Sequence, residues 1–306
     1  MSVDHQLSQK QCGVATNLPT YVLITPARNE AAFIEQTILS VIRQTVLPAK
    51  RVIVSDGSKD GTDKIVEQYA LRFPWIELVR MPKRADRHFG GKALAFNAGY
   101  ERIRNVQFDI IANFDADITF DEEYFCYLLE QFIQDPCLGV AGAPFRQGSF
   151  HNNYRFSRKE HVSGACQLFR RKCFESIGGN VPINEGGIDL AAVVTARMKR
   201  WKTETFAGKY CIHNRSMGKA GPHLFKYFFR SGVGDYRMGM HPFWQFFRSI
   251  YQMSNKPLFL AGFLHLVGYF WAMLFRAPKP VSQEFVNFRR KEQIVWLKEY
   301  YKKRFI

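Results

Sequence analysis

Residues 109–117 read DIIANFDAD, a run of mainly apolar side chains that ends in two carboxylates separated by one alanine. An apolar run of this length followed by a turn predicts a buried β-strand. Carboxylates at positions i and i+2 at the end of one strand can share a divalent cation, and their hard oxygen atoms suit Mg²⁺ or Mn²⁺. Asp115 and Asp117 are therefore candidate metal ligands, although an acidic turn that caps the next helix would have the same sequence.

The segments on either side of this strand alternate between strand and helix patterns. Strands are predicted at 21–25, 51–55, 76–80, 109–114 and 138–143, and helices at 31–44, 62–73, 90–104 and 121–134. This alternation predicts an α/β fold in which helices wrap a parallel sheet. Ligands of such sheets bind beyond the carboxyl ends of the strands, where Arg28, Glu30 and Asp56 also lie.

A second candidate site opens the helix at 90–104. Gly90, Gly91 and Lys92 follow a basic loop that contains Arg84. A helix N-terminus attracts phosphate and a lysine adds a point charge, so this segment predicts phosphate binding. It is not a P-loop, and no G-x-G-x-x-G follows the first strand, which argues against a dinucleotide-binding domain.

The charge of the chain is concentrated in its second half. The 306 residues are enough for one large domain or two modest ones. The net charge of the chain is +16, and the excess of basic residues lies in residues 151–306, which hold 27 Lys and Arg against 9 Asp and Glu. This indicates an anionic partner, such as nucleic acid, an acidic membrane or a phosphate-bearing substrate. No nucleic-acid-binding module is visible, so nucleic acid is not expected as a partner.

Residues 257–275 are apolar apart from His265 and are long enough for one transmembrane helix. Basic residues on both flanks, together with Pro257 and two glycines, argue against a span. The preceding residues, 224–251, mix aromatic and basic side chains as helices at a membrane interface do. A monotopic helical appendage that associates with an anionic membrane surface is therefore favoured over a true span. A helical layer packed on the first domain is the remaining alternative.

The cysteines and the N-terminus indicate a cytosolic compartment. None of the six cysteines has C-x-x-C spacing, and six in a chain of this length do not make a disulfide scaffold, so reduced thiols are expected. Residues 1–17 are polar and lack the apolar core of a signal peptide. Combined with the basic half, this predicts a location at the cytoplasmic face of the cell membrane, as a peripheral or monotopic protein.

Four motifs occur in order: PARNE at 26–30, VSDGSKDGT at 54–62, GKALAFNAG at 91–99 and FDAD at 114–117. Together they resemble the family 2 glycosyltransferases, nucleotide-sugar enzymes of the GT-A fold. The likeness extends over residues 20–215, and the C-terminal pattern is similar to that of bacterial exopolysaccharide glycosyltransferases. The resemblance implies a GT-A domain at 18–220, followed by a helical, membrane-associated region at 221–306.

The resemblance also implies roles at the edge of the sheet. Asp56 would bind the nucleobase of a UDP- or GDP-sugar, and the metal on its diphosphate would be held by Asp115, Asp117 and His213. The implied donor-binding residues are Pro26, Arg28, Glu30, Asp56, Arg84, Lys92 and Asp115. A departing nucleoside diphosphate gains negative charge, which a metal ion and basic side chains neutralise.

The family usually places its catalytic base after a glycine-rich turn. The matching segment reads NEGGIDL at 184–190, where Asp189 fits the base position and Ile188 stands where a glutamate is common. Glu185 is the alternative base, and Asp189 could instead cap the helix that follows. A carboxylate base would take the proton of the acceptor hydroxyl, and the anomeric configuration would invert.

Two features of processive glycosyltransferases are absent from the sequence, and this narrows the expected type of enzyme. The Q-x-x-R-W segment and the long membrane spans of processive synthases are missing, so one sugar per acceptor is expected. The resemblance then implies a metal-dependent, non-processive hexosyltransferase acting on a polyprenyl-linked or growing saccharide in cell-surface polysaccharide synthesis. The alternative is a peripheral membrane or nucleic-acid-binding protein on a degenerate transferase fold. A sugar-phosphate nucleotidylyltransferase would need a glycine-rich loop after the first strand, which residues 26–30 lack.

Overall fold

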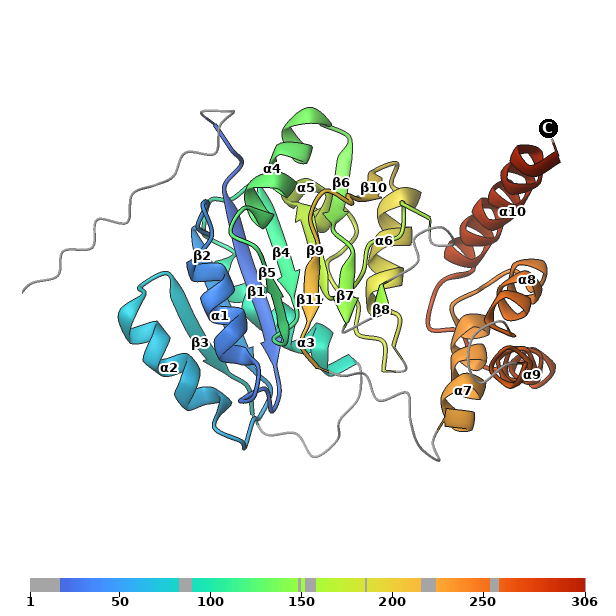
Figure 1. Cartoon of the computed structure of the whole chain (residues 1–306), viewed down its shortest axis with the longest axis horizontal. Coiled ribbons are helices and arrows are strands. Elements are labelled where there is room, and N and C mark those ends of the chain that lie inside the picture. The colour runs from blue at the N-terminus through green and yellow to red at the C-terminus, as the bar shows by residue number, and fades with distance from the viewer. Residues whose placement is uncertain are drawn as a thin grey trace, which may run out of the picture.

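The computed structural model describes residues 17–82, 90–147, 150–151, 158–184, 186–215, 224–253 and 259–305. A sheet wrapped by helices forms one part, and a group of C-terminal helices lies at one end of it (Figure 1).

The first part is built on a seven-stranded sheet. Its strands, in spatial order, are β10 (Lys202–Thr205), β6 (Leu138–Gly142), β9 (Cys166–Arg170), β4 (Ile110–Phe114), β1 (Tyr21–Ala27), β2 (Lys50–Ser55) and β3 (Ile76–Arg80). Strands β4, β1, β2 and β3 are parallel to one another, whereas β9 is antiparallel to both of its neighbours. The five predicted strands are present and run parallel to one another, because β4 and β6 are both antiparallel to β9; the sheet is mixed because it also contains β9, which was not among the predicted strands. A strand buried on both faces has the same apolar pattern in either direction, so its sequence does not reveal its orientation.

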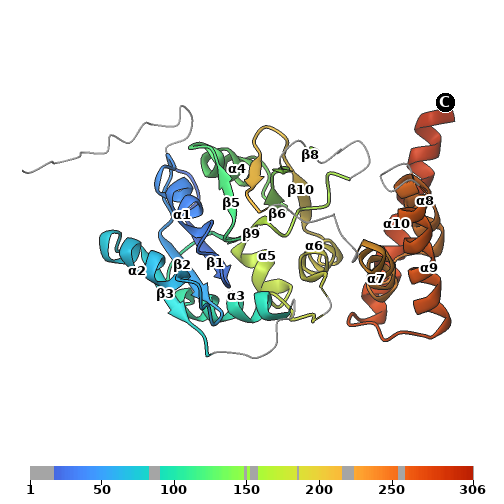
Figure 2. The same ribbon diagram turned by 60° about the horizontal axis from the view of Figure 1, so that its bottom comes forward.

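Helices cover both faces of this sheet, because successive side chains of a strand point to opposite sides. Tyr21 and Leu23 of β1 belong to one core and Val22 and Ile24 to another. The first face carries α1 (Ile34–Ile42), α2 (Thr62–Arg72) and α4 (Tyr124–Gln134), and the second carries α3 (Gly90–Ile103), α5 (Arg171–Ser176) and α6 (Ile188–Met198) (Figure 2).

A second, four-stranded sheet lies beside the end of β4. Its order is β5 (Ile118–Phe120), β11 (Cys211–His213), β7 (Phe145–Gln147) and β8 (Phe150–His151). Strand β5 begins directly after Asp117 and pairs antiparallel with β11, so that His213 is opposite Ile118. This pairing brings a histidine from late in the chain to the Asp115–Asp117 turn.

The C-terminal helices pack with their backbones in direct contact. They are α7 (Leu224–Arg237), α8 (Pro242–Met253), α9 (Leu260–Leu274) and α10 (Gln283–Phe305). A Cβ atom added to Gly232 of α7 would lie 2.0 Å from the carbonyl oxygen of His265 in α9, and one added to Gly268 would lie 2.1 Å from that of Phe229. Only glycine permits this approach.

The apolar run at 257–275 contributes a helix of 15 residues, α9, which is shorter than the run itself. His265 of this helix is fully buried, and its Nε2 lies 2.8 Å from Oδ2 of Asp235 in α7. Arg248 of α8 approaches the other oxygen of Asp235 at 3.0 Å, so three helices share this polar cluster. No helix within the described ranges combines the length and the apolar character needed to cross a membrane.

The C-terminal helices also contact the first part of the protein through α6. The guanidinium of Arg197 in α6 makes two hydrogen bonds, of 2.7 and 3.0 Å, to the carboxylate of Glu292 in α10. At the start of α6, a Cβ atom on Gly187 would lie 3.1 Å from the sulfur of Met238. The helix that carries Asp189 is therefore packed against the C-terminal region.

The cysteines agree only in part with the expectation of reduced thiols. Cys137, Cys166, Cys173 and Cys211 are free, whereas Cys126 is disulfide-bonded, which corrects the expectation for that residue.

Candidate active site

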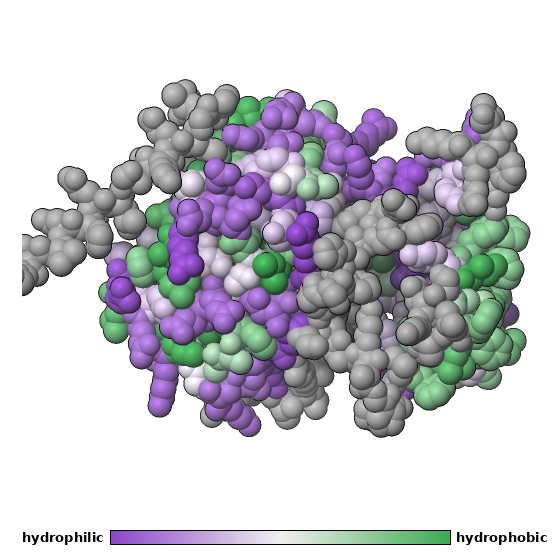
Figure 3. All heavy atoms as spheres, in the orientation of Figure 1, coloured by the Kyte–Doolittle hydropathy of each residue, from purple (hydrophilic) through white to green (hydrophobic). Residues whose placement is uncertain are grey.

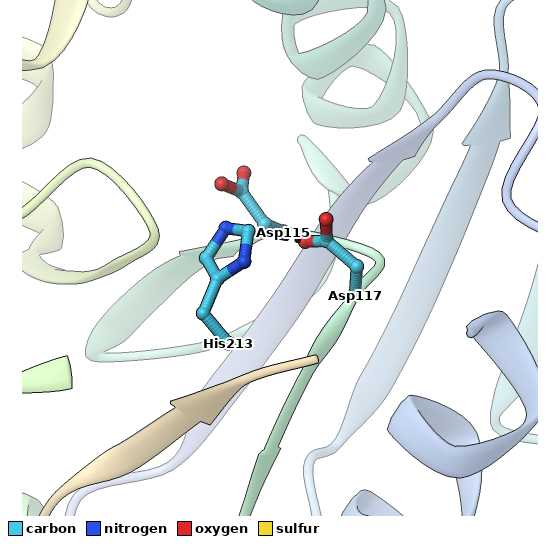
Figure 4. Close-up of side chains that lie close together, drawn as sticks. All are labelled: Asp115, Asp117 and His213. Carbon is cyan, nitrogen blue, oxygen red and sulfur yellow. Dashed lines mark ion pairs between the residues drawn. The ribbon is translucent and has the colours of Figure 1, made fainter. Parts of the chain in front are cut away.

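Asp115, Asp117 and His213 form a compact group at the end of β4 (Figure 4). One ligand atom from each side chain lies within 4.8 Å of the others. The turn that carries the two carboxylates is fixed by backbone contacts. The N–H of Asp115 donates to the carbonyl of Ala165 at 3.0 Å, and that of Asn214 donates to the carbonyl of Asp117 at 2.8 Å. The group is therefore held by three segments of the chain.

The donor set of this group fits a divalent cation. Two carboxylates supply the hard oxygen atoms that Mg²⁺ and Mn²⁺ prefer, and these ions commonly retain substrate phosphates as further ligands. Among the described residues, one group of three or more Asp, Glu, His or Cys side chains has a spacing suited to a metal ion, and it is this group. The structure thus brings together the three residues expected to hold the metal.

Two basic residues balance the charge of this acidic group. Lys92 forms an ion pair with Asp115, and its Nζ donates to the carbonyl of Gly164 at 2.9 Å. Arg215 donates from Nε to Oδ2 of Asp117 at 3.1 Å and from Nη2 to the carboxylate of Glu30. Burial alone would lower the pKa of Lys92, but the carboxylate of Asp115, with smaller contributions from Asp189 and Asp117, raises it above its usual value.

Glu30 shares this electrostatic environment. Burial raises the pKa of its carboxyl group, the hydrogen bond from Arg215 opposes that rise, and the negative charge of Asp117 adds to it. Glu30 therefore belongs with Asp115 and Asp117 in one cluster of like charges, in which Arg215 pairs with Glu30 and Asp117. From the sequence alone Arg215 is a candidate phosphate ligand, but its two carboxylate partners are not indicated. Arg215 and Asp117 are separated by 98 residues in the sequence, and Arg215 and Glu30 by 185.

The loops after β1 and β2 are joined side by side by hydrogen bonds. Arg28 lies 3.4 Å from the carboxylate of Asp56, which is 6% exposed. Asn29, with a φ of 56°, accepts from the N–H of Lys59 through its side chain at 2.9 Å. The left-handed backbone at Asn29 is tolerated by asparagine and turns the loop toward β2. Pro26 is an internal residue of β1, opposite Val54, so the strand does not end at the proline.

Asp60 is a positioning residue that the sequence did not single out. Its carboxylate accepts from the N–H of Ala31 at 3.0 Å and from the hydroxyl of Thr62 at 2.6 Å, and that hydroxyl in turn accepts from the N–H of Glu30 at 2.8 Å. Burial alone would raise the pKa of Asp60, but these hydrogen bonds lower it below its usual value. The turn motif that surrounds Asp60 was visible, but its partners lie in a different loop.

Asp189 lies in the first turn of α6, one residue after the helix begins. Gly187, with a φ of 88°, occupies the N-cap position, so the alternative role of Asp189 as a cap is wrong. A Cβ atom on Gly164 would lie 2.7 Å from Cβ of Asp189, which shows that the two segments are in direct contact. Because Lys92 binds the carbonyl of Gly164, the carboxylate of Asp189 is close to the Lys92–Asp115 pair. Two further candidates, Arg84 and Glu185, lie outside the described residues.

Known proteins share parts of this sequence and fold. "Probable glycosyltransferase YdaM" of Bacillus subtilis is 29% identical over 133 residues, which are 42% of this chain and 30% of that protein. "Poly-beta-1,6-N-acetyl-D-glucosamine synthase" of Staphylococcus aureus is 31% identical over 117 residues, 38% of this chain and 26% of that protein. The chain thus spans about a third or less of the length of these curated relatives.

A solved structure extends the likeness over nearly the whole chain. The mannosyltransferase PcManGT of Pyrobaculum calidifontis, in complex with GDP-Man and Mn²⁺, superposes with a TM-score of 0.58 at 20% identity, covering 94% of this chain and 83% of that one. At this identity the match establishes the fold, a mixed sheet flanked by helices as in GT-A glycosyltransferases. The model of glycosyl transferase family 2 matches residues 22–190, more than half of the sequence. With its motifs, its fold and this match in agreement, the chain belongs to glycosyl transferase family 2.

Proposed function

We propose that this protein is an inverting, non-processive hexosyltransferase that moves one sugar from a nucleoside-diphosphate sugar to a saccharide or polyprenyl-linked acceptor. The observation that carries the proposal is the convergence of Asp115, Asp117 and His213 at the sheet edge, beside Glu30. The complex of PcManGT with GDP-Man and Mn²⁺ supports a nucleotide-sugar donor and a divalent ion. The relative named as a poly-N-acetylglucosamine synthase supports a role in cell-surface polysaccharide synthesis.

The donor would lie along the ends of β1, β2 and β4. Asp56, buried at the tip of β2 and approached by Arg28, would accept hydrogen bonds from the nucleobase. Lys92 and Arg215 would face the diphosphate, because both already pair with the carboxylates around the metal site. A guanidinium and an ammonium each bind phosphate oxygen strongly.

Asp189 would serve as the base on the acceptor side. Its carboxylate would accept the proton of the acceptor hydroxyl while that oxygen attacks the anomeric carbon. The new bond would form opposite the breaking bond to the diphosphate, which inverts the anomeric configuration. A divalent ion held by Asp115, Asp117 and His213 would neutralise charge on the departing diphosphate. Lys92, tied to both Asp115 and the Gly164 segment, would hold the two halves of the site together.

The proposal predicts slow turnover of one donor by the full-length chain. Incubated with a panel of UDP- and GDP-sugars and Mn²⁺, the protein should release the nucleoside diphosphate from one of them, since water can replace an absent acceptor. Chromatography of the nucleotide products measures this release. The proposal is contradicted if no donor is consumed and calorimetry detects binding of neither UDP nor GDP.

The region 221–306 would place the enzyme on an anionic membrane at the cytoplasmic face, next to the catalytic domain at 18–220. Apolar side chains gather on the surface of α8 and α9, as the green area at the right of Figure 3 shows. The exposed apolar residues include Phe243, Phe246, Phe247 and Ile250 of α8 and Phe263, Val267, Phe270, Trp271 and Leu274 of α9. Soluble monomers rarely expose a continuous apolar surface of this kind, and exposed Lys226, Arg230 and Arg276 add positive charge near it.

The full-length chain should therefore co-sediment with vesicles that contain anionic lipid, and less completely with neutral vesicles. Salt should weaken the association without abolishing it, because apolar burial is not screened. The double variant Phe263→Ser, Leu274→Ser removes side chains that are 55% and 76% exposed and should lower the bound fraction at least about tenfold.

Leu71→Ser is the matched control, because Leu71 is 88% exposed on α2 of the first part. Its binding should equal that of the unmodified chain. If the unmodified protein remains in the supernatant at low salt with anionic vesicles, the C-terminal helices are not a membrane-binding region.

A further inference from the structure

The two carboxylate oxygens of Asp117 face different side chains. Oδ2 accepts from Nε of Arg215 at 3.1 Å, and Oδ1 lies 3.6 Å from Nε2 of His213. The other end of the Arg215 guanidinium holds Glu30. One arginine thus holds Oδ2 of Asp117, a carboxylate that the proposed metal ion would use, and also bridges to Glu30.

We propose that Arg215 is an internal counter-cation that releases Asp117 when metal and nucleotide diphosphate arrive together, so that the two ligands bind cooperatively. The inference rests on the proposed function, because it assumes that the Asp115–Asp117–His213 group is the metal site. It adds an order of events: metal alone competes with Arg215, and the diphosphate relieves that competition.

The charges around the site explain why the arginine is present. Glu30, Asp115 and Asp117 are three acids in one cluster, and the raised pKa of Glu30, which comes first from burial and then also from Asp117, reflects their crowding. Lys92 balances Asp115, and Arg215 balances the other two. A divalent ion placed on Asp117 would repel the guanidinium, which then needs another anion. The diphosphate supplies one in a geometry suited to arginine.

Lys92 is less suited to the same movement. Its ammonium is attached on one side to Asp115 and on the other to the carbonyl of Gly164, next to Asp189. Arg215 instead extends from the end of β11 with its guanidinium 5.2 Å from the ring centre of Phe33, and its side chain is 38% exposed. The aromatic ring supports the planar group without adding a carboxylate, so a turn of the side chain toward a phosphate leaves Phe33 in place.

Mn²⁺ binding measured by electron paramagnetic resonance tests the proposal without turnover. Arg215→Gln should bind Mn²⁺ alone about 5- to 150-fold more tightly than the unmodified protein, the range of typical coupling between two ligands. Saturating UDP or GDP should tighten Mn²⁺ binding strongly in the unmodified protein and much less in Arg215→Gln. By linkage, the gain in nucleotide affinity on adding Mn²⁺ should shrink by the same factor.

Two control variants separate release from general electrostatics. Arg80→Gln removes an arginine whose Nε also donates to a carboxylate at 3.1 Å, that of Asp63, and should leave Mn²⁺ binding unchanged. Arg215→Lys keeps the charge and should bind Mn²⁺ alone nearly as weakly as the unmodified protein. The thermal unfolding of each variant reports folding, and Arg215→Lys keeps the comparison available if Arg215→Gln is unstable.

The proposal is overturned if Arg215→Gln binds Mn²⁺ alone no more tightly than the unmodified chain, or if the enhancement by UDP or GDP is the same in both. An equal enhancement would mean that the arginine acts only through its net charge. Failure of the proposed function has a different signature, namely that the unmodified protein binds neither Mn²⁺ nor nucleotide in any combination.

Discussion

Replacing Asp117 by asparagine should lower the turnover of the donor sugar by at least about a hundredfold, because one carboxylate is lost that would hold the divalent ion on the leaving diphosphate. Asp117 is 6% exposed, and its backbone is fixed by Asn214, so the variant should keep the fold. The amide retains the shape of the side chain but not its charge. Release of nucleoside diphosphate at saturating Mn²⁺ measures the effect, and excess chelator should stop the unmodified enzyme.

Asp63→Asn is the control for this change. Asp63 also accepts from the Nε of an arginine at 3.1 Å, but it lies in the first turn of α2, outside the site. Its turnover should stay close to that of the unmodified chain. Full activity in the presence of chelator, or undiminished turnover by Asp117→Asn, would show that the group at the end of β4 is not a catalytic metal site.

The elements around the site follow from local sequence patterns. The strand that ends before Asp115 is buried along its whole length, and its apolar run is visible without any tertiary information. The same is true of β1 and β2, so the positions of Glu30 and Asp56 at one sheet edge follow from the strand–helix alternation. Topology then brings these residues together, because the ends of parallel strands share an edge.

Contacts between distant segments were not predictable in the same way. Arg215 reaches Glu30 and Asp117 across large separations in sequence, and no local pattern indicates which carboxylates an arginine will meet. Asp60 has a clear place in a turn, but its partner Ala31 belongs to another loop. Such pairs depend on how strands are ordered in the sheet, which periodicity does not encode.

The C-terminal helices show a different limit of prediction from sequence. The composition of residues 257–275 allowed either a membrane span or a packed helix. Gly268 lets α9 approach the backbone of α7, and Asp235 pairs with His265 between them. A buried carboxylate is costly unless its partners are present, and Arg248 and His265 both lie against Asp235, so these contacts favour one specific arrangement of α7, α8 and α9. The sequence contained each residue but not their pairing.

The C-terminal helices, which carry the proposed membrane surface, contact α6, the helix that carries the proposed base Asp189. Arg197, two turns after Asp189, makes a bidentate ion pair with Glu292 of α10. The start of the same helix touches Met238. A surface that holds a lipid-linked acceptor would therefore be in mechanical contact with the helix that presents the proposed base.

Asp189→Asn should reduce sugar transfer by about two to four orders of magnitude, the usual contribution of a general base. Binding of the nucleoside diphosphate should change little, because Asp189 lies across the Gly164 segment from Lys92 and is not among the proposed metal ligands. Calorimetry with UDP or GDP in the presence of Mn²⁺ measures the binding step, and product formation with acceptor measures transfer. Asp189→Asn should therefore lose transfer and keep nucleotide binding.

Asp63→Asn is the control for this prediction as well, because Asp63 also lies in the first turn of a helix. Asp63 occupies the first turn of α2 as Asp189 does that of α6, and either carboxylate stabilises its helix by about 0.3–1 kcal/mol. Asp63→Asn and Asp189→Asn should therefore lose similar stability in thermal unfolding, while Asp189→Asn alone loses transfer. Parallel loss of binding and transfer in Asp189→Asn would assign the residue a structural role. Loss of transfer in Glu185→Gln, with Asp189→Asn still active, would move the base to Glu185, because only the group that accepts the proton is indispensable to that step.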